Sequence, residues 1–227
     1  MLVCVILFTS FYNCTSVKTD VKSQKISTDS LSLIAQVGNE VYKSDKPEQK
    51  FVIPIEGYKA TSLGKAVYDG DTGLIQELIS SGLTSERCLT DETYVFDILY
   101  TALEFKKLDV VRFILQHKLF ADINVTYSED AETPLTLACN LPENEVTFEI
   151  VKSLIKLGAN IDGAGESGGE ETKYPIIIAV SQNNFRLTQY LLDHGVNKDV
   201  KNSQGETLLM IAQKNGNIEI EGLLRSN

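Results

Sequence analysis

Apolar residues recur along most of the chain at spacings of three and four, the pattern of one buried helix face. The clearest unit, residues 132–162, reads E-T-P-L-T-L-A-C and then, after ten residues, I-V-K-S-L-I-K-L-G-A-N-I-D. Pro134 opens a short helix, because proline at the first turn has a preset φ and needs no N–H partner. A second helix follows and ends at Gly158 in a left-handed turn. A unit of about thirty residues cannot bury its apolar face alone, so the pattern predicts similar neighbours.

Four further segments align with this unit in register. The five segments open at Thr61, Asp97, Thr133, Tyr174 and Thr207. Each has alanine at its sixth position, namely Ala66, Ala102, Ala138, Ala179 and Ala212. The steps between openers are 36, 36, 41 and 33 residues. The longest step has two local causes, extra residues around Leu141–Val146 and a Gly-rich stretch at Gly163–Gly169.

These segments resemble the ankyrin repeat, whose pattern runs T-P-L-H-x-A-A-x-x-G and then V-V-x-x-L-L-x-x-G-A with a period of about 33 residues. The resemblance covers residues 57–227, about three quarters of the chain. It implies an all-α fold, an ankyrin-repeat solenoid of about five helix-turn-helix repeats with hairpin fingers. It also implies a protein-binding module that presents its finger tips and the inner faces of its first helices as a concave surface.

The same resemblance assigns binding residues to the inner-helix positions that follow the alanine and to the finger positions before each opener. The implied protein-binding residues are Tyr68, Asp69, Tyr94, Phe96, Glu104, Phe105, Glu129, Asp130, Leu141, Glu170, Glu171 and Gln182. Aromatic rings among carboxylates are typical of interfaces, where rings supply contact area and charges supply orientation. Taken singly, each residue is also explained as ordinary solvated surface.

The charge of the chain bears on the kind of partner. Formal net charge is −10, from 31 acidic and 21 basic side chains. Residues 15–56 hold six of each sign and residues 1–14 hold none, which leaves 25 acidic and 15 basic side chains from residue 57 onward. The excess of acidic side chains gives this part of the chain a negative electrostatic field, which repels nucleic acid and attracts basic surfaces. We therefore expect a protein partner with a basic surface and no nucleic acid; acidity that serves only solubility is the alternative.

The N-terminus has the features of an export signal. Leu2–Phe8 is an uncharged apolar run, too short to span a bilayer. Phe11-Tyr12-Asn13-Cys14 resembles a loose bacterial lipoprotein box, which implies lipidation at Cys14 and a membrane anchor. The Phe and Asn flanking Tyr12 depart from that box, and no basic residue follows Met1. A plain cleaved signal and a structureless terminus therefore remain alternatives.

The predicted organisation has three parts. Residues 1–14 form a signal peptide that ends at the lipobox-like cysteine, residues 15–56 a flexible stalk and N-terminal cap, and residues 57–227 the ankyrin-repeat domain. This arrangement predicts a bacterial cell-envelope protein, lipid-anchored in the periplasm or at the outer-membrane surface. A secreted or soluble periplasmic protein is the alternative.

Nothing in the sequence indicates an enzyme. No H-E-x-x-H or C-x-x-C motif occurs, and the Gly-rich stretch carries Glu166 where a phosphate loop would avoid negative charge. His117 and His194 stand near the ends of second helices, where histidine caps terminal carbonyls. Cys139 is expected to be a buried thiol, and a disulfide to Cys88 is the alternative. We predict no catalytic residue, metal, cofactor or small-molecule substrate.

Two functions fit these observations. The first is a protein-binding scaffold or inhibitor, tethered to the bacterial envelope, that uses an acidic concave face. The second is a structural or surface lipoprotein whose repeats act as a spacer or adhesin without a single tight partner. Binding that depends on inner-helix residues would distinguish the first from the second.

Overall fold

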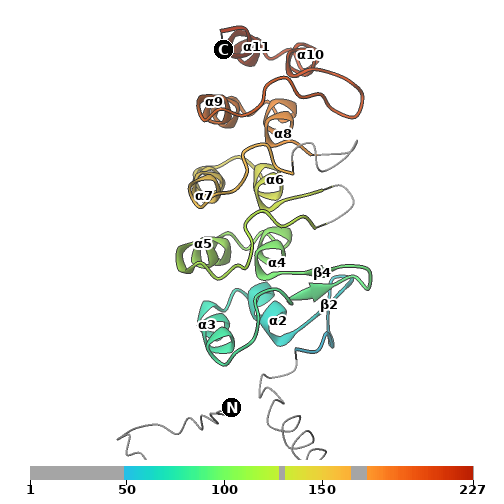
Figure 1. The fold of residues 1–227 in the computed structure, drawn as a ribbon, viewed down its shortest axis with the longest axis vertical. Coiled ribbons are helices and arrows are strands. Elements are labelled where there is room, and N and C mark those ends of the chain that lie inside the picture. The colour runs from blue at the N-terminus through green and yellow to red at the C-terminus, as the bar shows by residue number, and fades with distance from the viewer. Residues whose placement is uncertain (1–48, 128–130, 165–172, 227) are drawn as a thin grey trace, which may run out of the picture. The chain divides into compact units, whose positions relative to one another are not determined.

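The computed structural model describes residues 49–127, 131–164 and 173–226 (Figure 1). Within them lie ten helices and four short strands. The helices are α2 (Ser62–Asp69), α3 (Thr72–Ser80), α4 (Ile98–Glu104), α5 (Leu108–His117), α6 (Pro134–Cys139), α7 (Glu145–Lys156), α8 (Pro175–Ser181), α9 (Phe185–Asp193), α10 (Leu208–Lys214) and α11 (Ile218–Ser226). The strands are β1 (Ile53–Ile55), β2 (Tyr58–Ala60), β3 (Leu89–Thr90) and β4 (Val95–Phe96). The predicted signal peptide and most of the predicted stalk lie outside the described residues.

The five predicted openers are confirmed as the N-caps of the five first helices, α2, α4, α6, α8 and α10. A side-chain oxygen of Thr61, Asp97, Thr133 and Thr207 accepts a hydrogen bond from a backbone N–H three residues on. Such a bond satisfies one of the N–H groups that a helix start leaves without a partner. Tyr174 makes no side-chain cap, but Pro175 follows it at the first helical position.

Second helices end in left-handed backbone, as the repeat pattern predicts. Gly158 follows α7 with a φ of 101°, a conformation that glycine adopts without strain. After α5 the same position is held by Lys118 with a φ of 53°. The second repeat therefore keeps the geometry of the others at some cost in strain.

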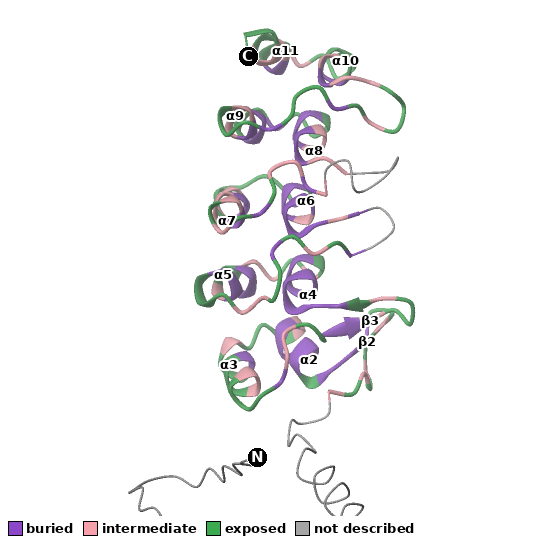
Figure 2. Ribbon diagram, viewed as in Figure 1, coloured by how far each residue is buried: buried purple, intermediate pink, exposed green. Residues whose placement is uncertain are grey.

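The helix pairs stack through their first helices, because α2, α4, α6, α8 and α10 each contact the next (Figure 1). On the second-helix side, α5 contacts α7 and α9 contacts α11. One cluster of buried apolar side chains runs through the stack, from Leu63 in α2 to Ile220 in α11. Figure 2 shows that the buried residues face the neighbouring helices, which is how units too small to fold alone share one core.

The predicted helical solenoid is confirmed with one addition at the N-terminal end of this region, a four-stranded antiparallel sheet in the order β1-β2-β3-β4, in which β3 and β4 form a hairpin finger between the first two repeats. Ile55 and Ala60 are buried, whereas Pro54 and Lys59 before them are exposed, which is the period of a strand rather than a helix. Glu56 and Gly57 join β1 to β2 with φ values of 44° and 93°, as in the two-residue turns that favour hairpins. The predicted boundary between residues 56 and 57 falls inside this turn.

Gln49 ties the start of the described region to the first finger. Its side-chain oxygen accepts from the Thr84 backbone N–H at 2.8 Å, and its amide nitrogen donates to the carbonyl oxygens of Thr84 and Arg87 at 3.0 and 3.1 Å. Three bonds across more than 30 residues make this segment part of the folded unit. Of the helices that the structure describes, none has both the length and the apolar character needed to span a membrane.

Candidate protein-binding surface

The C-terminal ends of the five first helices form one row, which we call the inner-helix row. Since these helices contact one another in order, residues at equivalent positions become neighbours. The row contains Tyr68 and Asp69 at α2, Glu104 and Phe105 at α4, Asn140 at α6, Ser181 and Gln182 at α8, and Lys214 and Asn215 at α10. The structure therefore brings together five of the sequence-predicted binding residues, from Tyr68 to Gln182.

Aromatic rings gather at the first two positions of this row. We define the aromatic patch as Tyr58 of β2, Tyr68 of α2 and Phe105 at the end of α4. The rings of Tyr68 and Phe105 are perpendicular, with centroids 4.9 Å apart and an interplanar angle of 88°. Tyr58 meets Phe105 in the same way, at 6.0 Å and 86°. Edge-to-face contacts of this kind are favourable and fix the orientation of each ring.

Two carboxylates hold the patch tyrosines by their hydroxyl groups. Tyr68 donates to Glu56 at 2.7 Å, and Tyr58 donates to Glu104 at 3.2 Å. The hydrogen bond to Glu56 raises the pKa of Tyr68, and burial raises the pKa of Tyr58. Both phenols therefore stay protonated at neutral pH and keep donating.

Lysine ammonium groups lie against the Tyr68 ring. Lys107 Nζ is 4.9 Å from the ring centroid and Lys65 Nζ is 5.8 Å from it, both within the range of a cation–π interaction. Lys65 is also paired with the carboxylate of Asp69. An open depression of about 280 Å³ adjoins these groups, lined by Glu56, Tyr68, Glu104, Phe105, Lys106 and Lys107.

Two predicted binding residues are buried instead, so their side chains offer no surface. Phe96 is 4% exposed, because the pairing of β4 with β3 turns its ring onto Tyr100, where the two rings stack at 4.1 Å. The alternate residue, Val95, points outward and is 51% exposed. Leu141 is 7% exposed and packs in the main core.

Of the other predicted binding residues, the structure describes Tyr94 but not the four finger carboxylates. Tyr94 is half-buried beside the Phe96 ring. Glu129, Asp130, Glu170, Glu171 and the predicted lipidation site Cys14 lie outside the described residues. At the described row positions, carboxylates occur only at Asp69 and Glu104.

Amide groups link the later positions of the row. The Gln182 amide donates to the Asn140 side-chain oxygen at 2.9 Å, and the Asn215 amide donates to the Ser181 carbonyl at 3.2 Å. These bonds connect neighbouring repeats. The row therefore changes along the stack from aromatic and charged at the first two helices to neutral and polar at the next two.

Asp97 is a buried carboxylate at the start of α4, and the sequence predicted for it only the role of an opener. It is 8% exposed, and one of its oxygens accepts from the Tyr100 N–H at 2.8 Å and from the Tyr127 hydroxyl at 3.0 Å. Burial raises its pKa from 3.8 to about 6. The charged form is therefore held at neutral pH against a desolvation penalty.

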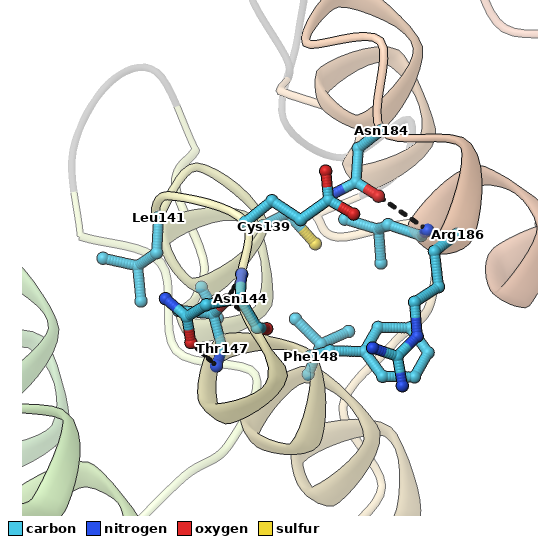
Figure 3. Close-up of a pocket in the computed structure, with 11 residues that line it drawn as sticks. Cys139, Leu141, Asn144, Thr147, Phe148, Asn184 and Arg186 are labelled. Carbon is cyan, nitrogen blue, oxygen red and sulfur yellow. Dashed lines mark hydrogen bonds between the residues drawn. The ribbon is translucent and has the colours of Figure 1, made fainter.

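A second cavity, shown in Figure 3, lies between the α6–α7 and α8–α9 pairs. Its volume is about 20 Å³, room for one water molecule, so it does not fit an organic ligand. The Arg186 guanidinium closes it from α9, 3.8 Å above the Phe148 ring, and donates to the two Glu145 oxygens at 2.6 and 3.1 Å. These contacts brace two neighbouring repeats.

The remaining candidates for chemistry have structural roles. Cys88 and Cys139 are buried free thiols, and burial raises the pKa of Cys139 to about 12, so that its thiol stays protonated at neutral pH. His117 and His194 each donate from Nδ1 to the carbonyl four residues earlier, at 2.9 and 2.8 Å, which confirms their predicted capping role. Among the residues that the structure describes, no group of three His, Cys, Asp or Glu side chains could hold a metal ion.

Sequence reasoning missed three members of this surface, Glu56, Tyr58 and Lys107. Glu56 and Tyr58 lie in the β1–β2 hairpin, ahead of the first repeat opener. The alternating I-P-I-E-G-Y-K-A stretch, with Gly57 at its turn, was the signal that could have located them. Lys107 follows α4, and no sequence pattern indicates that its ammonium reaches a ring from another repeat.

Comparison with known proteins agrees with the repeat fold. A family profile described as ankyrin repeats (3 copies) matches residues 63–164 and 143–227. A putative ankyrin repeat protein of Acanthamoeba polyphaga mimivirus is 30% identical over 98 residues, 43% of this chain and 13% of that protein. The human ankyrin repeat and SOCS box protein 11 is 32% identical over 93 residues, 41% of this chain and 26% of that protein. The chain thus spans about a quarter or less of the length of these relatives.

Proposed function

Because the chain belongs to the ankyrin-repeat family, whose members generally bind other proteins and are typically not enzymes, we propose that it is a protein-binding scaffold or inhibitor that docks its partner on the inner-helix row. The aromatic patch carries this proposal. It places Tyr68 and Phe105 on the row where the family resemblance implies contact, with Tyr58 of β2 beside them, and all three rings are half-buried.

The patch has the energetic features of an interface anchor. Aromatic rings bring large contact area with few rotatable bonds, so they lose little conformational entropy on binding. Here their orientations are already set by edge-to-face packing and by the hydrogen bonds to Glu56 and Glu104. Preorganisation of this kind raises affinity because less ordering remains to be done in the complex.

The charge of the chain supports a partner with a basic surface. The 25 acidic and 15 basic side chains from residue 57 onward produce a negative field, which accelerates encounters with positive partners and weakens as salt rises. At the described row positions the acids stand at α2 and α4, beside the aromatic rings. The acidic end of the row is therefore also its aromatic end.

The test is affinity capture with the immobilised full-length chain at two salt concentrations. The variant Phe105→Leu keeps apolar volume but removes the ring, and Phe185→Leu is its matched control, since Phe185 is 37% exposed on α9 outside the row. We expect the same partner on the unmodified chain and on the control, and loss of at least 80% of it on Phe105→Leu, by analogy with interface anchors that contribute about 1–2 kcal/mol. Equal capture by both variants would refute the proposal, and the spacer or adhesin function would replace it.

Tethering through Cys14 is a separate proposal that rests on the N-terminal sequence alone. The run Leu2–Phe8 followed by F-Y-N-C supports it, whereas the relatives reported above are viral and human. Mass spectrometry of the mature protein from its native host tests the proposal. We expect an N-terminal peptide that begins at Cys14 and carries an acyl mass, lost in Cys14→Ser; an unmodified Met1 or a peptide that begins at another residue would refute it.

A further inference from the structure

We infer that the aromatic patch is a receptor for a basic side chain of the partner, an ammonium or guanidinium group, and that Lys107 occupies it in the unbound protein. The inference rests on the proposed function for placing the partner on the inner-helix row. It adds the chemistry of the contact, which neither the fold nor the relatives specify.

The position of Lys107 is the first observation. Its ammonium lies 4.9 Å from the Tyr68 centroid, and it forms no ion pair with any residue that the structure describes. Lys65, at 5.8 Å from the same ring, is instead paired with Asp69. The face of Tyr68 thus attracts cations, because an aromatic ring carries negative charge density on its faces. Lys107 can leave the ring without breaking an ion pair.

The surroundings of the ring are the second observation. Glu56 and Glu104 line the same depression as Tyr68 and Phe105, and each already accepts one tyrosine hydroxyl. A carboxylate has about four acceptor sites, so both retain capacity for an N–H donor from a ligand. An ammonium or guanidinium group is bound well where an aromatic ring faces its charge and carboxylates accept hydrogen bonds from its N–H groups. The depression offers both.

The charge balance explains why a cation fits better than a neutral group or an anion. Glu56 and Glu104 are opposed by Lys106 and Lys107 around the depression. A partner's cation that displaced Lys107 from the ring would take over its cation–π contact, and the released ammonium would turn to solvent. A neutral group that displaced Lys107 would leave the ring face without a cation, and an anion would face both carboxylates. The depression, at about 280 Å³, has room for the end of one lysine or arginine side chain.

The experiment follows the ring resonances of ¹³C-labelled tyrosine and phenylalanine by NMR in the full-length chain. The probes are n-butylammonium, n-butylguanidinium, sodium acetate and uncharged 1-pentanol, at constant ionic strength. We expect the two organic cations to shift the Tyr68 and Phe105 signals in a saturable way, while acetate and 1-pentanol do not. Phe105→Leu should abolish the cation-dependent shift of Tyr68.

The decisive variant is Lys107→Met, which keeps the length of the side chain and removes its charge. It should tighten cation binding about two- to fivefold, because the probe no longer competes with an exposed cation–π contact. Lys152→Met is the matched control, since Lys152 Nζ lies 5.6 Å from the Phe148 ring on α7, outside the row. The control should leave the probe affinity at Tyr68 unchanged.

The outcomes separate this inference from the proposed function. Shifts of equal size from 1-pentanol, stronger shifts from acetate, or no gain in Lys107→Met would overturn the cation receptor. If partner capture still requires Phe105 in that case, the row binds its partner by apolar contact alone and the proposed function stands. If the cations bind as expected but capture is indifferent to Phe105, the receptor stands and the partner site lies elsewhere.

Discussion

Burial of the Asp97 carboxylate predicts that the stability of the protein depends on pH, and that Asp97→Asn removes this dependence. Asp97 caps α4, and one of its oxygens accepts hydrogen bonds from the Tyr100 N–H and the Tyr127 hydroxyl, while the backbone of Leu99 is a third hydrogen-bond partner of the carboxylate. Asparagine at this position can present its carbonyl oxygen to the same two donors. Asp97→Asn therefore removes the charge and keeps the hydrogen bonds from Tyr100 and Tyr127, so that the pH dependence of the difference in stability reports the cost of burying the charge.

The magnitude follows from the pKa of the carboxyl group. Burial, opposed in part by the hydrogen bonds from Tyr100 and Tyr127, raises this pKa from 3.8 to about 6. That difference corresponds to about 3 kcal/mol between the two protonation states. Because the folded-state pKa is the higher one, the folded protein binds the proton more tightly. The stability due to the protonated form is complete below about pH 4 and is lost as pH rises through about 6.

Urea unfolding of the unmodified chain and of Asp97→Asn between pH 4 and pH 7.5 measures this contribution. As pH rises across that interval, the free energy of unfolding of the variant should increase relative to that of the unmodified chain by about 3 kcal/mol, most of it between pH 4 and pH 6.5. Asp71→Asn is the control for replacing an N-cap aspartate, because Asp71 also caps a helix, α3, but is exposed to solvent. A pH-independent difference for Asp97→Asn, or one that narrows as pH rises, would refute the reasoning.

Three further substitutions test how the repeats are built. Gly64→Ala should unfold the first repeat or lower the free energy of unfolding by more than about 3 kcal/mol in a thermal scan, because the new Cβ would lie 2.1 Å from the Cys88 carbonyl oxygen. In the control Gly73→Ala the new Cβ meets only a side-chain oxygen, that of Asp71 at 3.4 Å, so the same scan should show no change or a gain of up to about 1 kcal/mol. Lys118→Gly should raise the free energy of unfolding in urea by about 0.5–1 kcal/mol, because glycine adopts the left-handed φ of this position with less strain than lysine. A loss of stability would show that this backbone is not strained. Gln49→Ala should lower stability by about 1–3 kcal/mol and raise hydrogen exchange in β1 and β2, and unchanged exchange there would show that the three bonds of Gln49 do not hold the hairpin.

The elements that the sequence predicted well are those determined by local chemistry. A helix start needs a side-chain acceptor or a proline at a fixed position, and the five openers supply one or the other at each N-cap. The C-terminal turns follow in the same way from Gly158 and its equivalents. These requirements are met within a few residues of chain, so they can be recognised without knowledge of the fold.

The predictions that failed depend on contacts made after the chain has folded. Phe96 and Val95 are neighbours in one short strand, and the register of that strand decides which of them is buried. The alternation in β1 and β2 spans only three residues on each side of a turn, too short to stand out beside the helical repeats. Lys107 reaches Tyr68 from the following repeat, a contact set by the stacking distance alone.

The sheet and the binding surface are physically connected. A first repeat has no preceding repeat to cover its apolar edge, and terminal units in stacked folds need a cover of some kind. Here the β1–β2 hairpin contacts α2, and its turn and second strand bring Glu56 and Tyr58 beside Tyr68 and Phe105. Farther along the row, the side-chain amides at α6, α8 and α10 are used to join one repeat to the next. Recognition should therefore concentrate at the first two repeats, because among the described residues it is there that a structure outside the repeat pattern adds groups that the bonds between repeats leave available.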